Sequence, residues 1–386
     1  MRLANITQES IDGYEKIVDR FKALGGVPSK KNEEYRYFDI ESILKKEYKT
    51  LKYDPTLIQE SEKITIVDGV VTTAPHGMRV YYKNFENISM EQFDPLYYVG
   101  HILSPRAIHI ELDGDTEVEI EHQFTKSNAL INYRIVLLNQ VNRHASVYER
   151  FVTNDIQDTL VLYGYDMQIA KDSSLRVVKI QTMQNNQYSM IASHNINVEK
   201  NATALLKSFD LGGDQSLQLL KVTLDEYAHI DAGHLLYLNS TAKRGTISQI
   251  VHRGINSTSK QNAKNILDGE ARGIFDALIR VEESAKFTKA EQNSKSIILH
   301  DNAYMASKPQ LEIYIDELEA SHGATTGQLD PKQLFYLQSR GVSLVEARKM
   351  LVVAFANSLI EEIRDGRIKE QIQEAFEELF YTTNKE

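Results

Sequence analysis

The sequence of 386 residues carries a formal net charge of −10, which argues against a nucleic-acid partner because phosphate backbones are bound by dense cationic surfaces. It contains no cysteine, which excludes disulfides, thiolate catalysis and a metal site ligated by its own cysteines. No apolar run approaches the roughly 20 residues that span a bilayer, and no signal-peptide core stands at the N-terminus, so we expect a cytoplasmic protein without a membrane partner.

The first part of the chain predicts a small helical domain with a few strands at its end. Apolar residues recur at helical spacing over residues 11–24, and Gly25 helps to end this helix. Asp39 is a suitable N-cap for a second helix that carries apolar residues over 40–44. We therefore place an N-terminal helical domain at residues 1–75.

The middle of the chain predicts many short strands. Ile108, Ile110 and Leu112 alternate with polar neighbours, and similar runs follow as far as Leu318. Such strands at near-regular spacing are typical of a sandwich, a barrel or a β-helix. Asn-Gly hairpin dipeptides are missing here, and Thr, Ser, Asn and Gln occupy many alternate positions, which favours a β-helix over residues 76–326.

The end of the chain predicts a helical bundle over residues 327–386. A short helix is capped by Asp330 and ended by Gly341, and a capping box of Ser343 and Glu346 opens a long helix. The expected apolar face of the long helix comprises Leu344, Ala347, Leu351, Ala354, Phe355 and Ile363, and that of a last helix comprises Ile368, Ile372, Phe376 and Leu379. An apolar face that remains uncovered would bind a partner.

The common catalytic motifs are absent: no phosphate-binding Gly-x-x-x-x-Gly-Lys loop, dinucleotide fingerprint, His-Glu-x-x-His helix or Gly-x-Ser-x-Gly elbow occurs. His229 and His234 on one strand would point to opposite faces, so we interpret them as unrelated strand histidines unless residues 231–233 turn the chain. Acidic residues gather between Asp276 and Glu283. They suggest an alternative function, a carbohydrate-active β-helix hydrolase or lyase with paired carboxylates, although the lack of tryptophan counts against sugar binding.

A histidine stands among small residues where the strand pattern gives way to the helical one. This is His322, within the stretch 321–327. Small neighbours let another backbone or an inorganic cluster approach, and imidazole is a competent iron ligand. The alternative is a histidine that caps a turn or a helix through hydrogen bonds, and spacing alone favours that alternative.

Four segments in the last third of the chain resemble the SufB/SufD family of iron–sulfur cluster assembly scaffolds. They are Glu270-Ala271-Arg272-Gly273, Lys308-Pro309-Gln310-Leu311-Glu312-Ile313-Tyr314, Ser321-His322-Gly323-Ala324-Thr325 and Leu334-Phe335-Tyr336-Leu337-Gln338-Ser339-Arg340-Gly341. Residues 33–37 are similar to the family's Glu-x-Trp-(Lys/Arg)-Tyr segment, with tyrosine in place of tryptophan. SufB proteins rely on cysteines, so the resemblance is to a SufD-type subunit.

The resemblance implies a mainly β fold, a right-handed parallel β-helix flanked by N-terminal and C-terminal helical domains. It implies a non-catalytic scaffold that works in a complex with a SufB-type scaffold and a SufC-type ATPase. No cofactor is then expected to bind stably to this chain alone, and a nascent iron–sulfur cluster forms at the SufB–SufD interface. Because a flat solenoid edge must be paired or covered, a homodimer is expected for the isolated chain.

The resemblance also implies roles for individual residues. His322 matches the family's proposed cluster ligand, while Ala320 stands where many relatives have a cysteine. The ATPase docks on the C-terminal helices of family members. The candidates for that contact are Phe335, Tyr336, Arg340 and Gly341. The alternative is that these four residues serve only to pack and cap the helices. For Phe335 this alternative is at least as well supported as an ATPase contact.

Overall fold

The structure is a computed structural model. It describes residues 14–32, 35–36, 38, 40–51, 57–86, 88–104, 106–153, 156–183, 188–212 and 215–383. The predicted beginning of the first helix at Ile11 and the predicted cap Asp39 lie outside the described residues.

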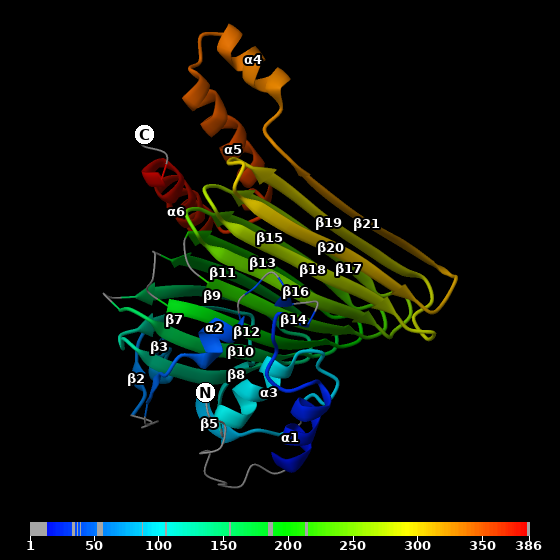
Figure 1. Ribbon diagram of the computed structural model, residues 1–386. Helices are drawn as coiled ribbons and strands as arrows, with labels where there is room; N and C mark the ends of the chain where they lie inside the picture. Colours follow the sequence, from blue (N-terminus) through cyan, green and yellow to red (C-terminus); the bar gives the residue numbers. More distant parts are fainter. Residues whose placement is uncertain are drawn as a thin grey trace.

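Two sheets form a flattened β-solenoid (Figure 1). Sheet A, with 10 strands in the described part of the chain, contains β1 (Lys49–Thr50), β5 (Val80–Asn84), β6 (Arg106–Leu112), β8 (Ala129–Asn139), β10 (Thr159–Ile169), β12 (Tyr188–Val198), β14 (Gln215–Leu224), β16 (Lys243–His252), β18 (Arg272–Val281) and β20 (Tyr304–Ile313). Sheet B, with 11 described strands, contains β2 (Gln59–Glu60), β3 (Ile64–Val67), β4 (Val70–Ala74), β7 (Thr116–Phe124), β9 (His144–Thr153), β11 (Ser174–Met183), β13 (Thr203–Gly212), β15 (His229–Leu238), β17 (Thr258–Leu267), β19 (Thr288–Ile298) and β21 (Leu318–Gly327). From β6 onwards the strands alternate between the sheets and pair in parallel within each, so the predicted mainly β fold with a β-helix core is confirmed; its handedness stays a prediction.

Each turn of the solenoid has the same construction. A turn takes 26 residues where Thr203 pairs with His229 and 32 residues where Arg272 pairs with Tyr304. At one corner of successive turns, a residue with positive φ donates its amide hydrogen to a carbonyl of the following turn. These corner residues are Asn142, Asp172, Asn201, Tyr227, Asn256 and Phe287. Asn and Asp adopt this left-handed conformation more readily than other residues with a side chain.

Many of the solenoid strands are buried on both faces. In β15, Ile230 and Leu236 face the interior, whereas Leu235 and Tyr237 belong to a cluster with the C-terminal helices on the outside of sheet B. The sequence of a strand that is covered on both faces is a nearly continuous run of apolar residues, without the alternation of apolar and polar residues that a half-buried strand has. Periodicity therefore detects these strands without revealing which face is inward.

Three helices cover part of the outer face of sheet A: α1 (Tyr14–Ala23), α2 (Ile40–Lys45) and α3 (Pro95–Leu103). α3 was not predicted from the sequence. Its residues from Pro95 to Ile102 are all buried, so the helix is apolar all round and has no amphipathic period to detect. Asp94 caps α3 by accepting hydrogen bonds from the amides of Leu96, at 2.9 Å, and Tyr97, at 3.1 Å.

Three more helices end the chain: α4 (Pro331–Ser339), α5 (Leu344–Ile360) and α6 (Gly366–Thr383). The predicted caps are present, since Asp330 accepts from the amide of Lys332 at 2.9 Å and Ser343 from that of Glu346 at 3.2 Å. α5 and α6 pack on the outer face of sheet B, and α4 projects beyond the solenoid (Figure 1). Among the described residues, no helix combines the length and hydrophobicity needed to cross a membrane.

The predicted buried face of the long helix is wrong in part. Ala354 and Leu344 are exposed, whereas Ala347 is buried as predicted. The buried residues of α5 are Ala347, Val352, Ala356, Leu359 and Ile360. The helix is apolar on both sides, so periodicity combined residues from two faces into one. The predicted domain boundaries stay predictions; α3 lies within the range assigned to the β core.

Candidate functional site

The end of the solenoid leaves two strands with a free edge. β20 is the last strand of sheet A and β21 the last strand of sheet B, so each has a neighbour on only one side among the described strands. Eight of the ten residues of β21 are exposed, and the other two are half-buried. A long, flat edge of this kind presents unpaired backbone groups to another chain, which makes it the first candidate for an interface.

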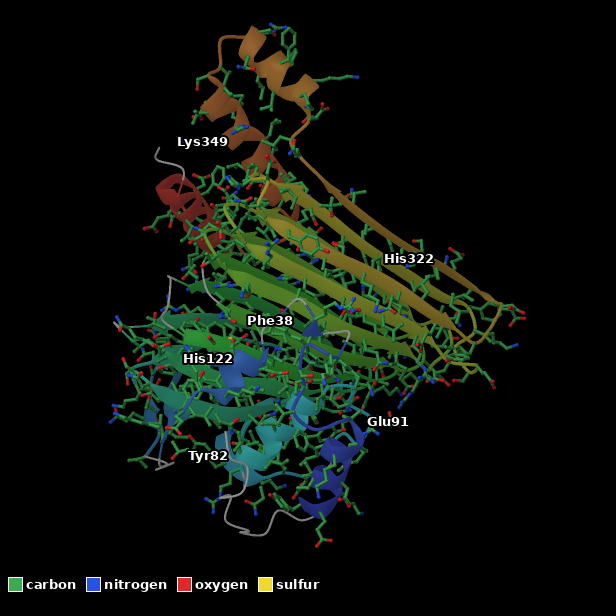
Figure 2. All side chains as sticks on the ribbon, viewed as in Figure 1. Phe38, Tyr82, Glu91, His122, His322 and Lys349 are labelled. Atoms are coloured by element: carbon green, nitrogen blue, oxygen red, sulfur yellow. The ribbon has the colours of Figure 1, made fainter. Side chains whose placement is uncertain are left out.

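His322 lies in the middle of this open edge (Figure 2). In sheet B, Gln261 pairs with Gln292 and Gln292 pairs with His322. Gln261 and Gln292 are both buried, so His322 continues a column of inward-facing residues at the last, uncovered turn. Within the column the side-chain amide of Gln292 donates a hydrogen bond to the side-chain oxygen of Gln261 at 3.1 Å. The side-chain amide of Gln261 in turn donates to the hydroxyl of Ser248 at 2.9 Å.

The surroundings of His322 are open. Its imidazole has no hydrogen bond or ion pair with any residue in the described part of the chain, so the predicted alternative of a capping histidine gains no support. A Cβ at Gly323 would lie 3.0 Å from the side-chain oxygen of Asn293, so glycine suits the close packing at this position. No group of three or more His, Cys, Asp or Glu side chains among the described residues is placed to hold a metal ion.

A second exposed surface lies on the C-terminal helices. No residue of α4, all of which are described, is buried; Phe335 is 73% exposed and Tyr336 is 58% exposed. Exposed apolar residues continue onto the first half of α5 at Leu344, Val345 and Met350. We call these five residues the helical apolar surface. Large exposed apolar surfaces mark sites of protein association.

The two remaining candidates, Arg340 and Gly341, directly follow α4 and differ in role. Gly341 has a φ of +86°, a conformation that favours glycine, and its amide donates to the carbonyl of Gln338 at 3.0 Å. The guanidinium of Arg340 lies over the ring of Tyr336, 5.4 Å from its centroid. Capping explains Gly341, while Arg340 extends the exposed surface around Tyr336.

The other candidates from the sequence do not form a site together. His229 and His234 lie on one continuous strand, β15; His229 is bonded to Thr258 at 2.5 Å, and His234 faces the interior. The acidic residues between Asp276 and Glu283 do not form a carboxylate pair, because they contact different neighbours. Asp276 accepts from Gln310 at 2.9 Å, and Glu282 lies 3.1 Å from the guanidinium of Arg280.

A network of charged residues inside the solenoid was not predicted from the sequence. Lys179 lies 3.0 Å from Asp210, which also accepts from His234 at 3.1 Å. Burial alone would raise the pKa of Asp210, but the charge of Lys179 and the hydrogen bond from His234 hold it well below its ordinary value. No sequence signal reveals such a pair, because its members lie on different strands that only the register brings together.

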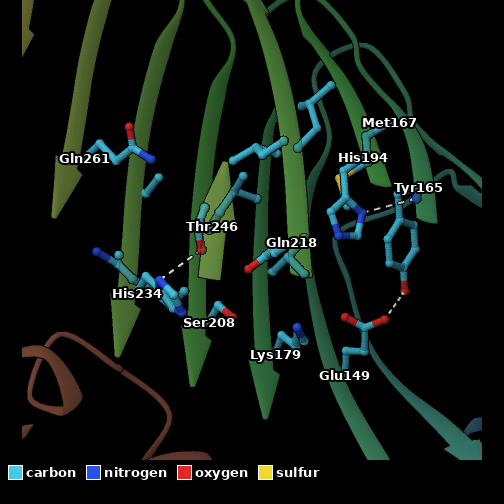
Figure 3. Close-up of a pocket in the computed structure, with 17 residues that line it drawn as sticks. Glu149, Tyr165, Met167, Lys179, His194, Ser208, Gln218, His234, Thr246 and Gln261 are labelled. Atoms are coloured by element: carbon cyan, nitrogen blue, oxygen red, sulfur yellow. Dashed lines mark hydrogen bonds between the residues drawn. The ribbon is translucent and has the colours of Figure 1, made fainter. Parts of the chain in front are cut away.

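A small cavity lies beside this network and is lined by two of its members, Lys179 and His234 (Figure 3). Its volume is about 60 Å³, and it lies between strands of both sheets. Glu149 accepts from the hydroxyl of Tyr165 at 2.8 Å, and the ring of His194 accepts from the amide of Tyr165 at 3.2 Å. The space suffices for water but not for a drug-sized molecule. We therefore regard the interior as structural and the open edge with His322 as the candidate site.

Comparison with known proteins agrees with this architecture. Residues 121–355 match the family described as "SUF system FeS cluster assembly, SufBD core domain". The iron-sulfur cluster assembly protein SufD of Escherichia coli is 30% identical over 240 residues, which cover 59% of this chain and 54% of that protein. A SufBD family protein of Synechocystis is 32% identical over a stretch that covers 45% of this chain and 38% of that protein. The SufD protein of Bacillus subtilis is 31% identical over a stretch that covers 34% of this chain and 30% of that protein. The chain thus spans about half the length of the E. coli relative and less of the other two. Because the family match covers more than half of the sequence, the chain belongs to the SufB/SufD family of the SUF system.

Proposed function

We propose that this chain is a non-catalytic, SufD-type scaffold of iron–sulfur cluster assembly in the cytoplasm. It works in a complex with a SufB-type scaffold and a SufC-type ATPase. The observation that carries the proposal is the pair of free strand edges in a member of this family, with an exposed histidine in the middle of one edge.

The free edges support a partner of similar construction. β20 and β21 end the two sheets side by side, so a second solenoid can extend both sheets by strand pairing. A SufB-type solenoid is the partner of the working complex. In isolation the same edges are available to a second copy of this chain, and a homodimer is then expected.

His322 supports the proposed assembly site. The nascent cluster is cargo here, and a neutral imidazole at position 322 can bind one of its irons. The described part of this chain offers no set of three ligands, so further thiolates or carboxylates would come from the SufB-type partner. Stable cluster binding is accordingly expected only in the complex.

The C-terminal helices support an ATPase contact. The helical apolar surface, with Phe335 and Tyr336, is available to a SufC-type protein. α5 in turn is fixed to sheet B by a hydrogen bond from Lys264 to the carbonyl of Phe355 at 3.0 Å, and the segment that follows α5 is fixed there by an ion pair of Glu362 with Lys207. A shape change driven by ATP hydrolysis can therefore pass through α5 to the solenoid and shift its edge.

Anaerobic reconstitution of the co-expressed three-protein complex tests this function. We expect His322→Ala to reduce iron and sulfide loading at least fivefold while the complex elutes unchanged from gel filtration, because an exposed side chain on a free edge contributes little to folding. The matched control is His300→Ala, which removes another exposed histidine on the turn before β20.

Two outcomes would contradict the proposal in different ways. Unchanged loading in the His322→Ala complex would show that this histidine serves no assembly site. Failure of the chain to co-purify with a SufB-type or SufC-type protein, together with turnover of a substrate by the chain alone, would reject the scaffold role itself.

A further inference from the structure

A hollow on the outer face of sheet A is lined mainly by charged side chains. It lies where β14, β16 and β18 pass α1 and the segment before α3, and it has a volume of about 400 Å³. Its charged lining residues are Arg20, Glu91, Lys221, Arg253, Arg280 and Glu282. We call it the basic hollow. Four cations thus face two carboxylates, on a chain whose formal net charge is −10. Glu91 is labelled beside α1 in Figure 2.

The strand alternation explains how these side chains meet. Val222 and Ile279 face the interior core, so their neighbours Lys221 and Arg280 point outward. Nearer the start of β14, the outward-facing Leu219 is covered by the N-terminal helices. The hollow therefore begins where the apolar cover of sheet A ends.

The carboxylates compensate only part of the positive charge. Glu91 forms an ion pair with Arg253, and Glu282 lies 3.1 Å from Arg280. Lys221 donates to the backbone carbonyl of Glu91, and its ammonium is 3.9 Å from the Glu91 carboxylate, which Arg253 already binds. Two cations, those of Lys221 and Arg20, thus remain without a carboxylate of their own among the residues that line the hollow.

Burial makes this excess charge costly. The side chain of Lys221 is only 4% exposed. Burial, together with the charges of Arg253, Arg20 and Arg280, lowers its pKa to about 8, against the opposing effect of Glu91. On α1, the Nε of Arg20 is buried without a hydrogen-bond partner among the described residues. Buried donors without partners are rare in proteins, and a bound anion would satisfy them.

We propose that the basic hollow binds a phosphate group, either as free phosphate or as part of a small molecule such as a nucleoside diphosphate. A phosphate carries about two negative charges, which matches the excess of two cations. The guanidinium forks of Arg253 and Arg280 suit its oxygens. The volume lies within the range of small-molecule sites, which leaves room for an organic part.

Glu91 acts as an internal competitor of this ligand. Its side chain is 60% exposed, so it can rotate into solvent and release Arg253 to the phosphate. A bound phosphate would then connect α1, through Arg20, to sheet A. This inference does not depend on the proposed scaffold function.

Isothermal titration calorimetry of the full chain at constant ionic strength tests the proposal, with sulfate, inorganic phosphate and ADP as probes. We expect Arg253→Gln to weaken binding at least tenfold, because it removes a guanidinium that binds the phosphate. We expect Glu91→Gln to strengthen binding at least threefold, because it removes the carboxylate that competes with the phosphate for Arg253. The matched control Arg143→Gln changes an exposed arginine on a solenoid corner and leaves the affinity unchanged.

The choice of probe separates the sources of the phosphate. Tighter binding of ADP than of phosphate supports a phosphorylated small molecule, and equal affinities support free phosphate. Sulfate keeps its charge between pH 6.5 and pH 9, so a loss of sulfate affinity over this range reports the deprotonation of Lys221. No binding of any probe, or equal binding by wild type and Arg253→Gln, would overturn the proposal.

Discussion

At the scale of single residues, the solenoid is held together by imidazoles as well as by apolar contacts. His252 is fully buried between β16 and the start of β17, bonded to the hydroxyls of Ser257 and Ser259 at 2.8 Å each. Burial lowers its pKa to about 4, and burial is also the main cause that lowers the pKa values of His101 and His194 to about 3. These imidazole rings are neutral in the folded protein, and protonation of any of them destabilises the folded state.

This arrangement predicts a loss of stability in mild acid. Between pH 6.5 and pH 4 the unfolded chain binds protons that the buried histidines do not, so the free energy of unfolding falls as the pH falls. Asp94 acts in the opposite direction below pH 6, because burial raises its pKa to about 6 and the folded state then binds the proton. The three histidines outweigh this single carboxyl.

Urea unfolding at pH 7 and pH 5 measures the effect. We expect His252→Asn to shrink the difference in unfolding free energy between the two pH values by about 2 kcal/mol, the contribution of one group with this pKa change. His300→Asn, in an exposed turn, should retain the wild-type difference. The same pH dependence in wild type and His252→Asn would show that His252 is not the buried neutral group described.

At the scale of elements, the corners set the regularity of the solenoid. Four of the six corner residues with positive φ are Asn or Asp, and the other two are Tyr227 and Phe287. An aromatic side chain has no local hydrogen bond to offset the steric cost of this conformation, about 1–2 kcal/mol for an L-residue. Phe287 is 58% exposed, so its ring gives up little burial if it is replaced.

We therefore predict that Phe287→Asn stabilises the protein by about 1 kcal/mol in chemical denaturation, because asparagine tolerates the left-handed conformation. The control is Val141→Asn, which makes a similar polar change at a residue that is 52% exposed, next to a corner residue but without positive φ. Equal effects of the two substitutions would mean that polarity, and not backbone conformation, determines the result.

At the scale of the whole molecule, the order of the helical and β regions could be predicted from the sequence better than the buried faces of the helices. Alternating strands and missing hairpin turns pointed to a solenoid, and the caps at Asp330 and Ser343 located the C-terminal helices. The buried α3 and the true face of α5 escaped prediction, because a helix that is apolar on every side has no readable period. For His322, spacing favoured a structural role. The role of cluster ligand was implied only by the resemblance, and the place of His322 on a free edge is seen only in the strand register.

The projecting α4 and α5 give the last prediction its physical basis. No residue of α4 is fully buried, and the five residues of the helical apolar surface remain exposed unless another chain covers them. Exposed aromatic residues of this kind are frequent hot spots, each worth about 2 kcal/mol or more of binding free energy. Phe335 and Tyr336 are the two aromatic residues of that surface.

We expect Phe335→Asp combined with Tyr336→Asp to reduce co-purification of the co-expressed SufC-type ATPase at least tenfold, because two carboxylates would be buried in an apolar contact. Circular dichroism should remain unchanged, since neither ring belongs to the core. The matched control is Leu57→Asp, which places a carboxylate at a leucine that is 89% exposed and far along the chain from α4. If the double variant retained the ATPase as the control does, the docking surface would lie elsewhere, and α4 would need another partner to cover it.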